Sequence, residues 1–202
     1  MGRINSRLTA IRRLGIGLSS AGREEEALSV KETELSLYRR LGVPEEHVLV
    51  AQGNLSNTYQ FLGRLEEALE MKQAVYLGHL RLNGEEHEGT LLEASNYADT
   101  LMHLNHFDEA KLLLRKMMPV ARRVFGDGNE ITLRMRWCYA GALYGDPGAT
   151  LGDLREAVTT LEDVERISRR VMSGAHPITE GIEDDLRNSR AALRARETPG
   201  DA

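Results

Sequence analysis

Several features that mark particular classes of protein are missing from this 202-residue chain. It has one cysteine, Cys138, which excludes an internal disulfide and fits a reducing compartment. No apolar run approaches the roughly 20 residues that a membrane-spanning helix needs, and the start MGRINSRLTAIRR is not followed by the apolar segment of a secretory signal. We therefore expect a soluble, cytoplasmic protein that has no membrane partner.

A surplus of positive charge is also missing. The formal net charge is -5, and the lysines and arginines are interleaved with acidic residues instead of being massed on one stretch. This pattern argues against a nucleic-acid partner. With 41% hydrophobic and 28% charged residues, the composition is that of an ordinary folded protein, and the length suffices for a large core or a short repeat array.

What the chain does have is one heptapeptide pattern written four times. The segments are GREEEAL (22–28), GRLEEAL (63–69), HFDEAKL (106–112) and GDLREAV (152–158). Their shared alanines, Ala27, Ala68, Ala110 and Ala157, are 41, 42 and 47 residues apart. A near-constant period of this size is typical of a solenoid, in which each repeat is one supersecondary unit stacked on the next.

The second repeat shows what the unit is. Apolar residues recur every three or four positions from Val48 to Leu62, then Gly63 interrupts the pattern, and the same periodicity resumes from Leu65. A glycine at such a point allows the left-handed conformation that closes a helix. The heptapeptide is therefore predicted to be the turn of a helical hairpin, and its alanine a point where two helices cross closely.

Aligning the other repeats with this one predicts nine helices. First helices are expected near 4–21, 48–62, 90–104 and 131–145, second helices near 23–41, 64–82, 106–125 and 153–172, and a polar capping helix near 178–196. These make one domain over 1–197, with repeats at about 4–42, 48–84, 90–126 and 131–173, and a frayed tail at 198–202.

These residues resemble tetratricopeptide repeats, and more narrowly the 42-residue variety of kinesin light chains. The resemblance rests on Gly84-Glu85-Glu86-His87, Ser173-Gly174-Ala175-His176-Pro177, Asn54-Leu55-Ser56 with Tyr59, Asn96-Tyr97-Ala98, and the four turns. It implies an all-α fold, a right-handed α-α superhelix (solenoid) of four helical hairpins plus a C-terminal capping helix. The chain lacks the cargo-adaptor coiled coil of a kinesin light chain itself.

Two kinds of residue depart from the repeat pattern. Lys31 and Lys72 stand four residues after a turn alanine, where the family often packs a large side chain, so we expect looser packing or a charged edge there. Gly15 and Gly17 lie inside the first helix, and each costs about 1 kcal/mol relative to alanine.

The sequence shows no convincing catalytic constellation. Glu45-Glu46-His47 and Glu85-Glu86-His87 precede first helices at matching places, which indicates architecture, not acid–base chemistry. His103 and His106 have an i, i+3 spacing but no further metal ligand in the helix. Cys138 lies in an apolar stretch and is expected to be a buried hydrophobe, and the glycines near 145–150 lack a phosphate-binding pattern. We predict no catalysis, cofactor or metal.

The resemblance implies that first helices line a concave, ligand-facing surface. The corresponding residues are Asn54, Asn57, Phe61, Asn96, Asp99, His103, Arg134, Trp137 and Gly141. Two alternatives stay open: Asn54 and Asn96 bond only to their own or neighbouring helices, or Trp137 belongs to the core. Leu92 stands where a chaperone-tail binder has a basic residue, which argues against a C-terminal carboxylate as ligand.

The functional hypothesis is a non-enzymatic protein–protein interaction module, a monomer that holds a peptide segment of a partner on its concave face. The alternative is a structural or sensor repeat region of a larger multidomain protein, or a self-associating stack. The sequence does not identify the partner.

Overall fold

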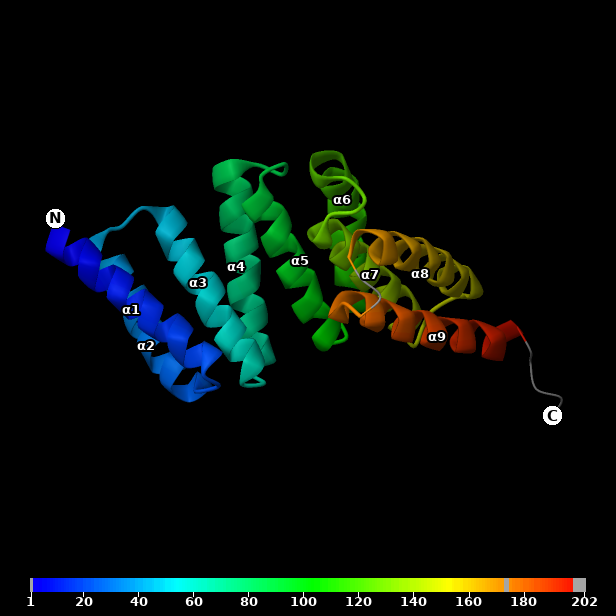
Figure 1. The fold of residues 1–202 in the computed structure, drawn as a ribbon, viewed down its shortest axis with the longest axis horizontal. Helices are drawn as coiled ribbons and strands as arrows, with labels where there is room; N and C mark the ends of the chain where they lie inside the picture. The colour runs from blue at the N-terminus through cyan, green and yellow to red at the C-terminus, as the bar shows by residue number, and fades with distance from the viewer. Residues whose placement is uncertain (1, 173–174, 198–202) are drawn as a thin grey trace. The chain divides into compact units, whose positions relative to one another are not determined.

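The computed structural model describes residues 2–172 and 175–197 and consists of helices joined by short turns (Figure 1). The helices are α1 (Gly2–Ser20), α2 (Glu24–Leu41), α3 (Glu45–Phe61), α4 (Leu65–Asn83), α5 (Glu88–His103), α6 (Phe107–Phe125), α7 (Glu130–Gly145), α8 (Leu151–Val171) and α9 (Pro177–Glu197). Within the described ranges there is no β-strand, so the predicted all-α fold of helical hairpins is confirmed. The expected frayed tail, 198–202, lies outside the described residues.

The chain divides into two compact units, Met1–Gly84 and Glu85–Ala202, which we call unit 1 and unit 2. In unit 1, α1 packs on α2, α2 on α3 and α3 on α4, and α1 also touches α3. In unit 2, α5 to α9 pack in sequence order, and the first helices α5, α7 and α9 also contact one another through α7. Helix α7 is therefore the centre of unit 2.

The turns inside the first three hairpins have the predicted left-handed residue. Gly63 has a φ of 75°, and the amide of Arg64 donates to the carbonyl of Tyr59 at 2.9 Å, which closes α3. In the third hairpin Asn105 takes the same conformation with a φ of 59°, and the amide of His106 donates to the carbonyl of Leu101. Asparagine tolerates this region better than most residues, so the motif survives without glycine.

The repeated heptapeptide has the structural role that its sequence indicates. All four turn alanines are completely buried, Ala27, Ala68, Ala110 and Ala157. The residue that follows each left-handed position pairs with a glutamate three residues on: Arg23 with Glu26, Arg64 with Glu67, and His106 with Glu109. His106 thus repeats an architectural contact.

Histidines before first helices serve as N-caps in unit 2. The Nδ1 of His87 accepts the amide of Gly89 at 3.1 Å, and the Nδ1 of His176 accepts that of Ile178 at 3.3 Å. The prediction that His47 precedes its helix at the same place as His87 is wrong, because α3 begins at Glu45 and His47 lies inside its first turn. Pro44 occupies the N-cap there, so the helix begins three residues earlier than the repeat register predicts.

The expectation of loose packing or a charged edge at two lysines is also wrong. Lys31 and Lys72 are 5% and 3% exposed. The ammonium of Lys31 donates to the hydroxyls of Ser19 (2.7 Å) and Thr58 (2.6 Å), and that of Lys72 donates to the amide oxygen of Gln60. Each long side chain reaches polar groups near the end of a first helix, so burial is compensated by hydrogen bonds.

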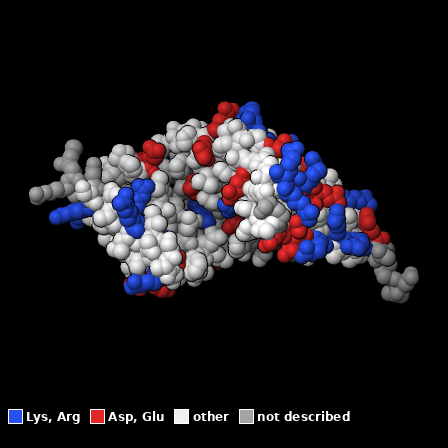
Figure 2. All heavy atoms as spheres, in the orientation of Figure 1, with Lys and Arg blue, Asp and Glu red and all other residues white. Residues whose placement is uncertain are grey.

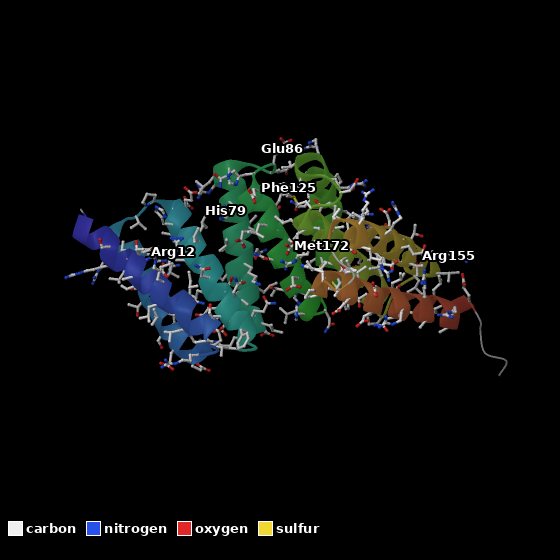
Figure 3. The ribbon with its side chains drawn as sticks, viewed as in Figure 1. Arg12, His79, Glu86, Phe125, Arg155 and Met172 are labelled. Atoms are coloured by element: carbon white, nitrogen blue, oxygen red, sulfur yellow. The ribbon has the colours of Figure 1, made fainter. Side chains whose placement is uncertain are left out.

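Helices α8 and α9 carry many charges of both signs on their outer surface (Figure 2). Arg155 pairs with Glu197 at 2.9 Å, Arg190 with Glu162 at 2.7 Å, and Arg169 with Glu183 at 2.9 Å. Figure 3 places Arg155 at the end of unit 2 where α9 finishes. These exposed pairs hold the capping helix along α8, and each contributes at most about 1 kcal/mol to the stability of the fold.

Candidate ligand-binding surface

A cavity of about 230 Å³ opens where α5, α7 and α9 meet in unit 2, and we call it the α7 cavity. Because all three are first-helix positions of the repeat, they present side chains to the same side of the hairpins. The lining residues are Ser95, Asp99, Met102, Arg134, Trp137, Cys138, Gly141 and Asp185.

The α7 cavity brings together some of the residues that the sequence singled out. Asp99 comes from α5, and Arg134, Trp137 and Gly141 come from successive turns of α7. That a ligand contacts these residues stays a prediction.

Two other predicted residues of α5 do not line the cavity. The side-chain amide of Asn96 donates to Glu93 at 3.3 Å, a contact within its own helix. The Nδ1 of His103 lies 2.8 Å from the backbone carbonyl of Asp99 and 3.6 Å from its carboxylate.

The predicted residues of α3 belong to unit 1 and are a separate set. Asn54 is half-buried, Asn57 is exposed, and Phe61 is exposed over 71% of its surface. An aromatic side chain this exposed is unusual at the end of a helix whose other apolar residues are buried or partly buried. Phe61 therefore remains a candidate contact residue of unit 1.

Trp137 is held on one side by the capping helix. Its indole Nε1 donates to one carboxylate oxygen of Asp185 at 2.6 Å, and the hydroxyl of Tyr144 donates to the other oxygen, also at 2.6 Å. Burial and the bond to Asp185 raise the pKa of Tyr144, so its hydroxyl stays a donor at neutral pH. The indole is half-buried and still lines the cavity, so it is neither wholly core nor wholly exposed.

Gly181 explains how α9 comes so close to the indole. A Cβ at this position would lie 2.4 Å from Cη2 of Trp137 and 2.6 Å from Cζ2, closer than real atoms approach. Only a glycine in α9 therefore leaves room for the ring. The indole is therefore positioned both by the absence of a side chain at Gly181 and by its hydrogen bond to Asp185.

Gly141 leaves space where α7 faces Met102 of α5. A Cβ there would meet only the terminal methyl of Met102, at 3.3 Å. A glycine inside a helix costs about 1 kcal/mol relative to alanine. Here the absence of a side chain at Gly141, which weakens the helix, also leaves the space that forms part of the cavity.

Cys138 is the one thiol in the cavity lining. Burial raises the pKa of Cys138 to about 12, with Asp99 raising it and Arg134 lowering it, so the thiol stays protonated and is a poor nucleophile. Among the described residues, no group of three His, Cys, Asp or Glu side chains is arranged to hold a metal ion. The volume is below the roughly 300–1,000 Å³ typical of small-molecule pockets, and it suits a single amino-acid side chain.

Four lining residues were missed at the sequence level as site residues: Ser95, Met102, Cys138 and Asp185. Asp185 matters most, because it fixes Trp137 from α9. The sequence of α9 predicts only a polar capping helix. Asp185 lies 48 positions after Trp137, so no local sequence pattern indicates that the two side chains are in contact. The one usable hint is Gly181, a glycine inside an otherwise helical pattern, one turn before Asp185.

Comparison with known proteins agrees with this architecture. A tetratricopeptide repeat model matches residues 48–88 and 94–130. A kinesin-light-chain-type protein from Podospora anserina with nearly identical TPR-like repeats is 23% identical over 95% of this chain and 89% of its own, with a TM-score of 0.77. BtubC (BKLC) from P. vanneervenii is 13% identical over 99% of this chain and 85% of its own, with a TM-score of 0.62. Among curated proteins, no sequence is significantly similar.

The two matched segments are of the tetratricopeptide-repeat class. The chain as a whole shares the fold of the solved kinesin-light-chain-like repeats. Proteins of this class generally act as protein-interaction scaffolds and not as enzymes. Across the described residues, every helix is too short or too polar to pass through a lipid bilayer.

Proposed function

We propose that this chain is a non-enzymatic interaction module that binds a peptide segment of a partner protein along its first helices, with the α7 cavity as the anchor point. A tetratricopeptide scaffold supports the general role. The cavity has room for one amino-acid side chain, and its wall contains the chain's single tryptophan. Both features support the α7 cavity as the place where the peptide is anchored. We assign this role to the cytoplasm, since the lone Cys138 needs no oxidising compartment.

The physical basis is preorganisation. Trp137 is fixed by Gly181 and Asp185, so a ligand that packs on it has little side-chain entropy to remove. Tryptophan is also enriched among the residues that dominate interface energies. Asp99 and Arg134 also line the cavity, so a peptide bound there would meet charged groups as well as the ring.

The test uses Trp137 as its own reporter. Peptides selected from a random display library on the immobilised chain are added to the free protein, and the emission of Trp137 is followed. Because this is the single tryptophan, a spectral change reports the α7 cavity. We expect the selected peptides to shift the emission with saturation.

The matched variants are Gly141→Leu and Gly145→Leu, both in α7. A leucine at 141 displaces the flexible end of Met102 and fills the cavity, whereas position 145 lies outside the lining and faces Phe107. We expect Gly141→Leu, shown to be folded by circular dichroism, to weaken binding at least tenfold and Gly145→Leu to leave it unchanged. Gly141→Ala, a smaller change, provides the comparison if the leucine variant does not fold. Peptides that bind all variants equally and leave the emission unchanged would refute the proposal.

A further inference from the structure

We propose that the side chain accepted by the α7 cavity is basic, a lysine or an arginine of the bound segment. This inference rests on the proposed function and specifies its ligand. It is carried by the charge of the lining, which contains two carboxylates, Asp99 and Asp185, and one guanidinium, Arg134.

Asp185 supplies a negative charge that its neighbours orient without cancelling. Both of the groups that donate to it, the indole of Trp137 and the hydroxyl of Tyr144, are neutral. Hydrogen bonds from neutral donors orient a carboxylate without placing a positive charge beside it. The charge is also fixed in position, because α9 cannot shift along α7 without losing both bonds.

Asp99 supplies the second negative charge from the opposite wall. Its electrostatic effect on the neighbouring thiol of Cys138 is larger than the opposing effect of Arg134. On its own helix, the Nδ1 of His103 lies 3.6 Å from the carboxylate of Asp99. With one guanidinium against two carboxylates, the interior of the cavity has a net negative charge.

The remaining lining suits the aliphatic stem of a long basic side chain. Trp137 provides an aromatic wall, Met102 a flexible apolar one, and Gly141 an open one. Aromatic rings next to carboxylates favour ammonium and guanidinium groups, because the π face and the charge act in the same direction. An acidic ligand side chain would instead meet two like charges.

Two substitutions with opposite expected signs test the inference. Using the peptides selected above, we expect Asp99→Asn to weaken binding about tenfold, and Arg134→Ala to strengthen it severalfold, since it removes the charge that opposes a basic ligand. Asp184→Asn is the control, because this carboxylate lies next to Asp185 in α9, is exposed, and pairs with Arg187. It should leave the affinity unchanged.

The ligand side gives an independent readout. Each selected peptide is resynthesised with its basic residues replaced singly by glutamine, and one replacement should lower the affinity about tenfold and abolish the Trp137 response. If peptides shift the emission and lose affinity in Gly141→Leu, yet are neutral or acidic, or are weakened by Arg134→Ala, the basic specificity is wrong while the binding site stands. If no peptide responds to Gly141→Leu, the proposed function itself has failed.

Discussion

Units 1 and 2 are built from the same hairpin but bury different side chains. Among the described residues, unit 1 buries the charged residues Glu24, Lys31, Glu34 and Lys72, whereas unit 2 buries Arg136 alone. Of the twelve largest fully buried side chains, nine apolar ones belong to unit 2, and the three in unit 1 include Glu34. Unit 2 is therefore held mainly by apolar packing, and unit 1 depends also on buried polar contacts.

The difference lies in how each first helix meets the next. In unit 1, Lys31 reaches between α1 and α3, and the carboxylate of Glu24 accepts the hydroxyl hydrogens of Ser19 (2.9 Å) and Thr58 (3.2 Å), so the three helices share one polar network. In unit 2 the residues four positions after the turn alanines, where unit 1 has Lys31 and Lys72, are Leu114 and Leu161, and both are fully buried. A rigid apolar frame suits a preformed site, because such a frame has few alternative packings.

The largest effect is expected from the core of unit 2. Leu114→Ala in α6 removes a fully buried side chain and should lower the free energy of unfolding by about 2–5 kcal/mol. Urea unfolding followed by Trp137 fluorescence measures this for unit 2 directly. The exposed Leu112, two residues earlier, is the control, and Leu112→Ala should change stability little. Equal losses in the two variants would contradict an apolar frame.

A smaller loss is expected where α9 docks on α7. Gly181→Ala places a methyl group against the ring of Trp137, and overpacking of this kind costs about 1–3 kcal/mol even though alanine favours the helix. The indole should move, so we expect a shifted emission maximum as well as a lower urea midpoint. Gly152→Ala in α8, where a Cβ meets only Thr150 at 3.5 Å, should show neither.

In unit 1 the buried carboxylate should give a pH dependence. Burial raises the pKa of Glu34, against the opposing effects of Tyr38, Arg12 and Lys31, and its Oε1 has no hydrogen-bond partner. The folded chain then binds the proton more tightly than the unfolded chain does. The contribution of Glu34 to stability therefore increases as the pH falls from the raised folded pKa toward the ordinary value of 4.5.

Glu34→Gln should remove that dependence and raise the free energy of unfolding at neutral pH by about 1 kcal/mol, because a buried charge no longer has to be accommodated. Chemical denaturation followed by circular dichroism at several pH values between 4 and 7, each roughly one unit apart, makes the measurement. Glu25→Gln, on the exposed face of the same helix, serves as the control. A lower stability of Glu34→Gln at every pH would show that the carboxylate is needed.

The smallest effect is expected in α1. Gly17→Ala adds a Cβ with no atom within 4 Å and should stabilise unit 1 by up to about 1 kcal/mol. Gly15→Ala should gain less, because its Cβ would lie 3.1 Å from Cγ of the buried Lys31. Thermal unfolding of the two variants separates a glycine that only weakens the helix from one that makes room for the polar network.

Much of the fold follows from short-range sequence patterns. The repeat period, the turn residues and the turn alanines predict nine helices. Over residues 2–172 and 175–197 the structure has them within a few residues of the predicted bounds. At two helices that begin earlier than predicted, the residue before the helix explains why. Pro44 is the N-cap of α3, which begins at Glu45. Thr150 forms a capping box with Asp153, and α8 begins at Leu151. Aligning every repeat with the second one could not predict these earlier helix starts.

The sequence alone determined the hairpin and the first-helix positions that hold Asp99, Arg134 and Trp137, because helix periodicity fixes which residues share a face. Only the tertiary structure decided that Lys31 and Lys72 are buried, since their hydrogen-bond partners lie on other helices. It alone also revealed the α7 cavity, in which Asp185 and Gly181 of α9 fix a tryptophan more than 40 positions earlier. Contacts at such separations depend on how helices pack, which no local pattern encodes.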